Sequence, residues 1–250
     1  MAATIYYDNV GSYAATLNDG STGSAVFSDG TTLTNEENAI DEDLTTVVGG
    51  WVSSEGLQFD LGSATTVSFC AIYSTVATSN DITIYRDDAS SGPFDSTTTV
   101  LGDTAIGWNL ISLASGDFRY FTVSAGGDLT GISQIFFGNA LELPIQPTAN
   151  VITEHKFGTE EIKAHGANRY YINKHDNYKV LKLSLDHMTT ANKTSLLTFS
   201  NTVTNRKPFI YSEDGVTGPL HYVRLAAPLT FKQVAPDIWS CQVVMRQLIS

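Results

Sequence analysis

Short runs in which apolar and polar residues alternate fill the first 140 residues, and no long helical pattern interrupts them. A period of two is typical of a β-strand, because successive side chains of a strand point to opposite faces. Glycine-rich turn signals, such as 18–20, 28–30 and 126–127, separate the runs. The expected strands are 57–61, 66–69, 81–85, 108–111, 120–123 and 132–136. Many short strands joined by such turns predict an antiparallel β-sandwich.

Charge divides the sequence into two parts of different chemistry. Through Leu143 the only basic side chains are Arg86 and Arg119, against eighteen acidic ones, a net charge of −16. From Pro144 onward twelve lysines and arginines face eight acids, a net charge of +4, and all five histidines lie in this part. One homogeneous domain would seldom divide its charge in this way. We therefore expect two domains.

A connector with two prolines marks the expected boundary. Pro144 and Pro147 each remove a backbone donor and bias the preceding residue toward extended geometry. The chain is long enough for two cores of about 100 to 150 residues each. We place the domains at 1–143 and 144–250.

The second part also has mainly strand patterns. The expected strands are 150–156, 167–172, 178–185, 208–211, 221–225 and 238–245, and 211–215 is expected to be a turn. One helix is expected at 189–199, because a threonine precedes it and Ala191, Ser195, Leu196 and Phe199 fall on one face. The pattern predicts an α+β or β-sandwich domain with a single helix across one face.

The two cysteines and the N-terminus give little information about the cellular compartment of the protein. Cys70 and Cys241 each lie in apolar alternation, so we expect buried free thiols rather than disulfide partners or nucleophiles. The first residues lack the basic and apolar regions of a secretion signal. No run approaches the roughly 18 apolar residues of a membrane helix. We expect a soluble protein without membrane insertion.

Several motifs of the first part occur in the order of a known family. The segment 39–46 with its two aspartates is followed by Trp51, by a strand that ends in Asp60-Leu61-Gly62, and by the alternating run 67–73. Later motifs at 81–88, 118–123 and 132–137 continue the order. Over about residues 4–138 this order resembles the discoidin, or coagulation factor 5/8 C-type, galactose-binding-like β-sandwich. The resemblance implies a jelly-roll sandwich that binds glycans, lipids or proteins through loops at one end, and we expect Trp51 in its core.

Some members of that family hold a structural calcium near the aspartate-containing turn. The resemblance makes Asp41, Asp43 and Thr46 candidate calcium ligands, because Ca²⁺ prefers hard oxygen atoms. The alternative is that the two aspartates cap a turn by accepting backbone N–H bonds. The family often closes the site with a glutamate, where this sequence has Gln134, and that departure counts against the metal.

Glycan recognition would need exposed aromatic rings and planar polar groups. Candidates beside turns are the aromatic residues Tyr6, Tyr7, Tyr13 and Phe94 and the polar loop of Arg86, Asp87 and Asp88. A single aromatic residue beside a turn is as well explained by covering the end of a sandwich, and surface charge is the default explanation of the polar loop. No ligand-binding residue is therefore assigned.

The second part resembles a different family. Its order is a strand at 150–156, a strand at 179–185, the helix, a Pro-Phe-x-Tyr strand at 208–211, and a terminal strand that begins near Trp239. Over about residues 150–250 this order resembles the minor tail protein M and distal-tail group of long-tailed bacteriophages. The resemblance implies a tail-tube-like β-sandwich with one flanking helix. None of its motifs is catalytic, so it concerns architecture.

Catalysis and nucleic-acid binding find no support in the sequence. It has no nucleophile elbow, dinucleotide-binding motif or phosphate loop. The histidines at 155, 165, 175, 187 and 221 show no spacing of a metal site. The acidic part would be repelled by phosphates, and the basic part has no dense basic stripe. We predict a protein that is not an enzyme.

Together these features predict a structural protein of a bacteriophage tail tip or baseplate, made in the host cytoplasm and carried in the virion. The C-terminal domain would form a homo-oligomeric ring with neighbouring tail proteins, and the N-terminal domain would project to bind another tail protein or a cell-surface glycan. The alternatives are a monomeric carbohydrate-binding or receptor-binding module and, with less support, an enzyme accessory domain.

Overall fold

The computed structural model describes residues 3–10, 16–18, 33–52, 56–88, 96–114, 116–143, 152–156, 159–163, 169–173, 178–215 and 218–248. Its backbone forms two compact units. We call Asp8–Ala140 the sandwich unit. The second unit combines Met1–Tyr7 with Leu141–Ser250, and we call it the split unit because it takes residues from both ends of the chain.

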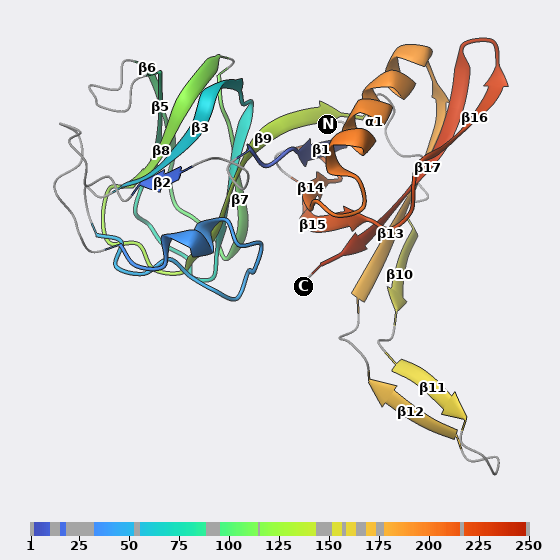
Figure 1. Ribbon diagram of the computed structural model, residues 1–250, viewed down its shortest axis with the longest axis horizontal. Coiled ribbons are helices and arrows are strands. Elements are labelled where there is room, and N and C mark those ends of the chain that lie inside the picture. The colour runs from blue at the N-terminus through green and yellow to red at the C-terminus, as the bar shows by residue number, and fades with distance from the viewer. Residues whose placement is uncertain are drawn as a thin grey trace. The chain divides into compact units, whose positions relative to one another are not determined.

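The sandwich unit contains two antiparallel sheets that share one core. One sheet has the strand order β2-β3-β8-β5-β6, and the other has the order β9-β4-β7 (Figure 1). The elements are β2 (Thr16–Asn18), the 3-10 helix η2 (Glu36–Ala39), β3 (Gly56–Thr66), β4 (Phe69–Ser74), β5 (Ile82–Asp87), β6 (Ser96–Leu101), β7 (Gly107–Ser112), β8 (Asp117–Ala125) and β9 (Ile132–Glu142). The predicted β-sandwich is confirmed for this part of the chain.

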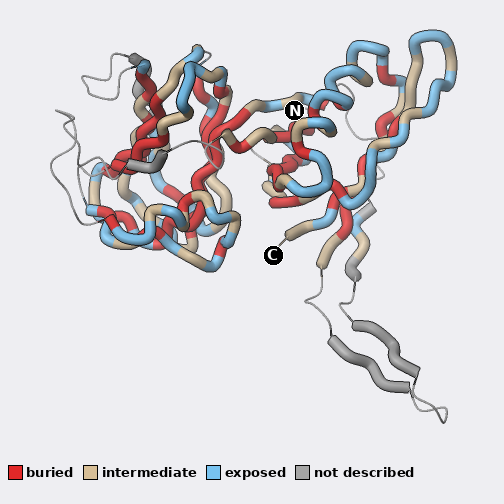
Figure 2. Tube along the Cα trace, in the orientation of Figure 1, coloured by how far each residue is buried: buried red, intermediate tan, exposed pale blue. Residues whose placement is uncertain are grey.

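Phenylalanine rings join the two sheets of the sandwich unit. Phe59 of β3 and Phe121 of β8 come from the five-stranded sheet, and Phe137 of β9 comes from the other. The centroid of the Phe137 ring lies 5.0 Å from that of Phe59 and 5.1 Å from that of Phe121, which is contact distance for aromatic pairs. Trp51 packs in the same core and is 2% exposed, as the sequence predicted. Figure 2 shows buried residues in red along the strands of this unit.

One expected strand of the sandwich unit is wrong. The run 66–69 was expected to be a strand, but β3 ends at Thr66 and β4 begins at Phe69. At this point the chain passes from one sheet to the other. Val67 is nevertheless fully buried between the two strands. Its burial explains the apolar residue at this position, although no continuous strand spans 66–69.

The split unit is built on one antiparallel sheet with the order β10-β13-β17-β15-β14-β1, and β16 pairs with β17 (Figure 1). A separate two-stranded sheet, β11-β12, lies in the connection from β10 to β13. The elements are β1 (Thr4–Tyr7), β10 (Ile152–Lys156), β11 (Thr159–Lys163), β12 (Arg169–Asn173), β13 (Tyr178–Met188), α1 (Thr190–Val203), β14 (Phe209–Ser212), β15 (Leu220–Leu225), β16 (Thr230–Ala235) and β17 (Ile238–Gln247).

The first strand of the chain belongs to this sheet. β1 pairs antiparallel with β14, and Ile5 lies opposite Tyr211 in the register. Within the same unit, the N–H of Leu143 donates to the carbonyl of Ala3 at 2.8 Å. Ile5 and Ala3 are fully buried in the core of the split unit. The sequence-based division at residue 143 gave these first residues to the N-terminal domain, and which segments fold alone stays a prediction.

Helix α1 packs on the sheet of the split unit. The side chain of Thr189 accepts a hydrogen bond from the N–H of Asn192, and the Asn192 side chain accepts one from the N–H of Thr189, which makes a capping box at the expected start. The buried residues are Leu196, Phe199 and Val203, on one face of the helix. The expected helix 189–199 is thus confirmed and continues for one further turn.

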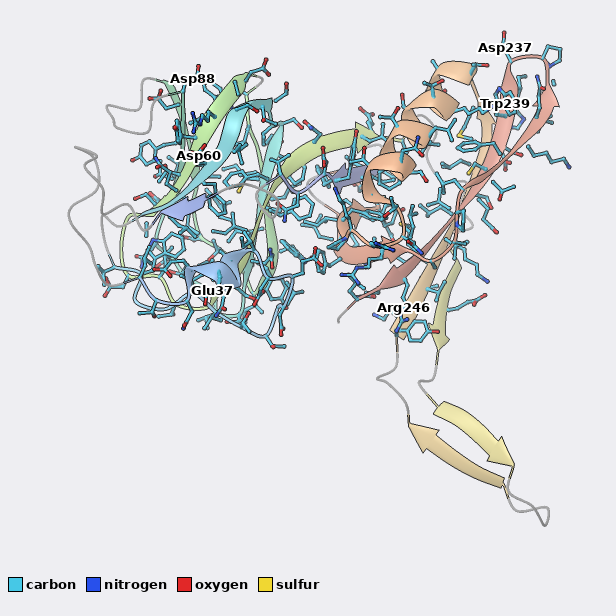
Figure 3. All side chains as sticks on the ribbon, in the orientation of Figure 1. Glu37, Asp60, Asp88, Asp237, Trp239 and Arg246 are labelled. Carbon is cyan, nitrogen blue, oxygen red and sulfur yellow. The ribbon has the colours of Figure 1, made fainter. Side chains whose placement is uncertain are left out.

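The last strand, β17, is buried along one face. Cys241, Val243 and Met245 of β17 are buried in the core. Trp239, near the start of β17, is only half-buried. Its ring centroid lies 3.4 Å from Nζ of Lys193, and its indole N–H donates to Oγ1 of Thr190 at 3.1 Å, so it packs against the start of α1 (Figure 3).

Both cysteines are free and buried, as the sequence predicted. Burial raises the pKa of the Cys70 thiol well above its ordinary value and raises that of Cys241 to about 11. Neither thiol is a reactive nucleophile at neutral pH. Among the residues that the structure describes, no helix has the length and apolar character to cross a membrane.

Candidate functional site

The turn 39–46 follows η2 and brings together the residues that the sequence proposed as calcium ligands. Asp41 accepts hydrogen bonds from the N–H of Asp43 at 2.8 Å and from Oγ1 of Thr46 at 2.7 Å. Asp43 accepts bonds from the N–H of Thr45 at 2.9 Å and from its Oγ1 at 2.6 Å. Each aspartate therefore accepts a bond from the N–H two residues later, which is the pattern of an Asx turn.

Two side chains of β9 hold this turn against the sandwich. Gln134 is fully buried, its Oε1 accepts a bond from the N–H of Glu42 at 3.0 Å, and its Nε2 donates to the carbonyl of Ala39 at 3.0 Å. Ser133 donates from Oγ to the carbonyl of Asp43 at 3.2 Å. An ionised glutamate at position 134 would have no donor for the Ala39 carbonyl. The amide is therefore the side chain that satisfies both backbone groups.

Oxygen atoms of all three candidate ligands converge in the turn. Oγ1 of Thr46 lies 2.7 Å from Oδ2 of Asp41 and 2.9 Å from the carbonyl oxygen of Asp43. One hydroxyl proton cannot serve both acceptors fully, because a hydroxyl donates once. Hydrogen bonds from the side chain and backbone of Thr45 lower the pKa of the Asp43 carboxyl, so the group is ionised at neutral pH. These oxygens match the ligand chemistry of Ca²⁺, and calcium binding stays a prediction.

The polar loop at Arg86 is different from the expectation. Arg86 was interpreted as surface charge, but it is fully buried in β5. Its Nη1 donates to the carbonyl of Ala114, and the guanidinium carbon lies 5.1 Å from the centre of the Phe118 ring. Burial lowers the pKa of Arg86. Asp88, two residues later, is exposed (Figure 3). The arginine therefore belongs to the interior of the sandwich.

The Asp60-Leu61-Gly62 motif has a structural role. Asp60 of β3 receives two bonds from the guanidinium of Arg119 on β8, at 2.7 and 2.8 Å. The same carboxylate accepts the N–H of Gly62 at 2.8 Å, and Gly62 has a φ of 76°, a conformation that favours glycine. The Arg119 guanidinium holds the pKa of Asp60 below its usual value.

An aromatic pair lies where β4 pairs with the edge strand β7. Tyr73 and Trp108 are register partners, and their ring centroids are 5.3 Å apart in an edge-to-face arrangement. Both rings are half-buried. At the same end of the ladder, Val76 is 46% exposed and Ile106 is 70% exposed. This end of the ladder therefore carries two aromatic rings and two exposed apolar side chains.

Asn109 fixes the loop that enters β7. Its Nδ2 donates to the carbonyls of Ala105 at 2.8 Å and Gly107 at 3.0 Å, and its Oδ1 accepts the N–H of Ala105 at 2.9 Å. The loop that carries Ile106 is thereby tied to the strand. The sequence analysis placed Trp108 in a strand and did not consider it for binding. The signal was present, since alternation puts Tyr73 on the face of β4 opposite to the core residues Cys70 and Ile72.

Of the aromatic residues named for glycan binding, the structure describes Tyr6 and Tyr7. Tyr6 and Tyr7 belong to β1 of the split unit. Tyr6 is 4% exposed, and the Tyr7 ring lies edge-on to Phe199 with centroids 5.3 Å apart. Tyr13 and Phe94 lie outside the described residues. Tyr6 and Tyr7 thus have packing roles.

No catalytic constellation is found within the part of the chain that the structure describes. In those residues no group of three or more His, Cys, Asp or Glu side chains could hold a metal ion. Burial lowers the pKa of His221, and Glu213 lies 3.7 Å from its Nε2. The side chains at positions 155, 165 and 175 lie outside the described set.

Comparison with known proteins gives similarity in part of the chain only. No protein-family model and no curated protein matches the sequence. The family 32 carbohydrate-binding module of C. perfringens NanJ, solved with galactose, is 15% identical with a TM-score of 0.38, over 55% of this chain and 99% of that one. Chitosan-binding module 2 of a chitosanase/glucanase from Paenibacillus sp. IK-5, solved with chitotriose, is 16% identical with a TM-score of 0.37, over 52% of this chain and all of that one.

Proposed function

We propose that this chain is a structural protein of a bacteriophage tail tip or baseplate. The split unit would assemble with copies of itself and with neighbouring tail proteins, and the sandwich unit would bind another tail component or a surface glycan. The observation that carries the proposal is the β11-β12 ribbon. Among the strands that the structure describes, β11 and β12 pair only with each other (Figure 1).

The ribbon interrupts an otherwise complete strand connection. β10 and β13 already pair up to the partners Lys156 and Tyr178, where a short turn would suffice. The chain instead extends and forms a second antiparallel pair, in which Thr159 lies opposite Asn173 and Lys163 lies opposite Arg169. A two-stranded hairpin is marginally stable alone in water, and each of its edges carries backbone groups that can pair with another chain. Pairing with a strand of another subunit would stabilise the hairpin and would satisfy the backbone groups at its edges.

The test is to remove the ribbon and measure assembly. Residues 157–177 would be replaced by a two-residue Asn-Gly turn that joins Lys156 to Tyr178. The wild-type chain is expected to form a discrete oligomer, alone or with other tail proteins, in mass photometry and negative-stain images. The shortened chain should stay monomeric with an unchanged melting temperature. The Val234→Ala variant, changed at an exposed position of β16, is the matched control. A wild-type chain that remains monomeric with every tail protein would contradict the proposal.

A carbohydrate-binding or receptor-binding module is the second candidate, and the Tyr73–Trp108 pair favours it. Aromatic rings at a partly exposed edge offer apolar faces of the kind that sugar rings contact. The test is a glycan array with wild-type protein and Trp108→Ala. Val100→Ala is the matched control, because Val100 is 54% exposed on β6 of the other sheet. Loss of glycan binding in Trp108→Ala alone would support this candidate, and an array without any signal would remove it.

For the turn 39–46 we propose Asp41, Asp43 and Thr46 as calcium ligands. Their convergent oxygens support the assignment, and the bound ion would neutralise part of the charge of this acidic loop. The alternative from the same contacts is a turn closed by its own hydrogen bonds. Calorimetry separates the two, as described below.

A further inference from the structure

A groove of about 530 Å³ in the split unit contains two arginines. Its lining residues are Tyr178, Val180, Asn205, Arg224, Leu225, Ala226, Arg246 and Leu248. Among the residues that the structure describes, the set combines two guanidiniums and one amide with apolar side chains. Small-molecule sites have this composition, with a few polar groups set in apolar walls.

The sheet register places the two guanidiniums on neighbouring strands. Arg224 of β15 lies directly opposite Arg246 of β17, between the partners Leu225–Met245 and Val223–Gln247. Leu225 and Met245 are buried in the core, so alternation directs the two arginines to the other face of the sheet. The two guanidiniums therefore place positive charge and planar N–H donors on one face of the sheet.

One of the two arginines is held in a defined position. The guanidinium carbon of Arg246 lies 4.0 Å from the centre of the Tyr178 ring, on the neighbouring strand β13 (Figure 3). Stacking on an aromatic face restrains the guanidinium while its N–H groups stay available at the edge of the plane. Arg246 is exposed and Arg224 is half-buried, so a ligand can reach the pair from solvent. Val180 and Leu248 supply an apolar wall beside them.

We propose that this groove binds a ligand that carries a carboxylate next to an apolar body. The planar fork of an arginine matches the two oxygens of a carboxylate, and two forks on adjacent strands can hold one carboxylate between them. The apolar part of the ligand would lie against Val180 and Leu248. Such a carboxylate can come from a small molecule or from the C-terminus of a partner polypeptide, and both present the same chemistry to the groove.

The experiment measures binding of defined carboxylates to the full chain by calorimetry and by NMR of the arginine side chains. The probes are benzoate and the dipeptide N-acetyl-Phe-Leu, with benzamide and the C-terminal amide of the dipeptide as uncharged counterparts. We expect saturable binding of both acids and at least about tenfold weaker binding of both amides, because a charge-assisted hydrogen bond is lost. Tighter binding of the dipeptide would identify a polypeptide terminus as the source, and equal binding would identify a small molecule.

Variants locate the binding in the groove. Arg246→Gln should weaken acid binding at least about tenfold, and Arg246→Lys should restore only part of it, because lysine keeps the charge without the fork. Arg206→Gln is the matched control, since Arg206 is exposed and does not line the groove. A melting temperature within a few degrees of wild type verifies folding of each variant. Absence of saturable acid binding to the wild type, an equal loss in Arg206→Gln, or stronger binding of inorganic phosphate than of benzoate would each overturn the proposal. The groove test uses a single chain, so it is independent of assembly.

Discussion

The two units solve the problem of burying a β-sheet in different ways. The sandwich unit uses one continuous segment and closes two sheets around Phe59, Phe121 and Phe137. The split unit covers one face of a sheet with α1 and takes its strand β1 from the other end of the chain. Its core therefore depends on a pairing between residues that are 206 positions apart in the sequence, Ile5 and Tyr211. The core of the sandwich unit comes from one continuous segment, whereas that of the split unit needs segments from both ends of the chain.

The strongest test of this difference is deletion of residues 1–7. The deletion removes the buried side chains of Ile5 and Tyr6 and the Tyr7 contact with Phe199. At roughly 1.5–3 kcal/mol for each large side chain that is fully buried, the loss is about 5 kcal/mol, which is comparable with the total stability of a domain. The split unit should unfold while the sandwich unit keeps its melting transition. Hydrogen exchange resolved by residue checks this.

Fragments complete that test. Residues 8–140 expressed alone should fold, and limited proteolysis of the full chain is expected to cut within 143–150, the connector that the sequence proposed as the boundary. A fragment 8–140 without cooperative unfolding would contradict the independence of the sandwich unit. Equal stability of the fragments 1–143 and 8–140 would place the first seven residues outside the N-terminal domain.

A matched pair of core truncations sharpens the comparison. Phe199→Ala removes a buried ring from the split unit, and Phe59→Ala removes one from the sandwich unit. Each should cost about 3–5 kcal/mol in its own unit. Differential scanning calorimetry should show one transition lowered and the other unchanged, in opposite order for the two variants. Lowering of both transitions by either variant would mean that the two units unfold together.

Calcium should act on the sandwich unit alone. With a dissociation constant tenfold below the free calcium concentration, ligand binding to the folded state adds about 1.4 kcal/mol. In calorimetry, millimolar calcium should then raise the melting temperature of the sandwich unit relative to EDTA and leave that of the split unit unchanged. Asp41→Asn should abolish the increase. Superimposable curves would leave the hydrogen-bonded turn as the full explanation of Asp41 and Asp43.

The smallest effect is that of pH on the Asp60–Arg119 ion pair. The pKa of Asp60 is lowered in the folded state, so the pair stabilises the sandwich unit above the unfolded pKa of about 3.9. That contribution is lost as the pH falls through the lower folded pKa. Because the Arg119 side chain is 41% exposed, solvent screens the ion pair and its contribution to the free energy of unfolding is small. Urea unfolding at pH 7 and pH 3 should show a smaller pH-dependent loss in Asp60→Asn, and an identical loss would exclude the pair as its source.

Local sequence patterns predicted the helix and the strands better than they predicted which strands pair with each other. The alternating run at 120–123 lies within β8, and the threonine start predicted α1 within one residue. Strand β16 was missed because its side chains are mostly exposed and polar, so it has no apolar alternation. The pairing of β1 with β14 leaves no local signal, because register between distant segments depends on the whole sheet.

The candidate site was predicted only where its residues lie close together in the sequence. Asp41, Asp43 and Thr46 are five residues apart or fewer, and the structure brings them together. The hydrogen bonds between Gln134 and the turn join residues more than ninety positions apart. The sequence identified position 134 only as a departure from a family pattern. The facing positions of Arg224 and Arg246 depend on strand register and could not be read from either strand alone.

The position of β1 has a consequence for synthesis on the ribosome. Its residues are translated before the sandwich unit, but their partner β14 begins only at Phe209. At about 5–20 residues per second, β1 waits roughly 10–40 s for that partner. During this interval the sandwich unit can fold while a short apolar segment remains attached to its N-terminal end. An affinity tag or fusion partner placed just before β1 would therefore be carried into the folding of the split unit, after the sandwich unit has formed.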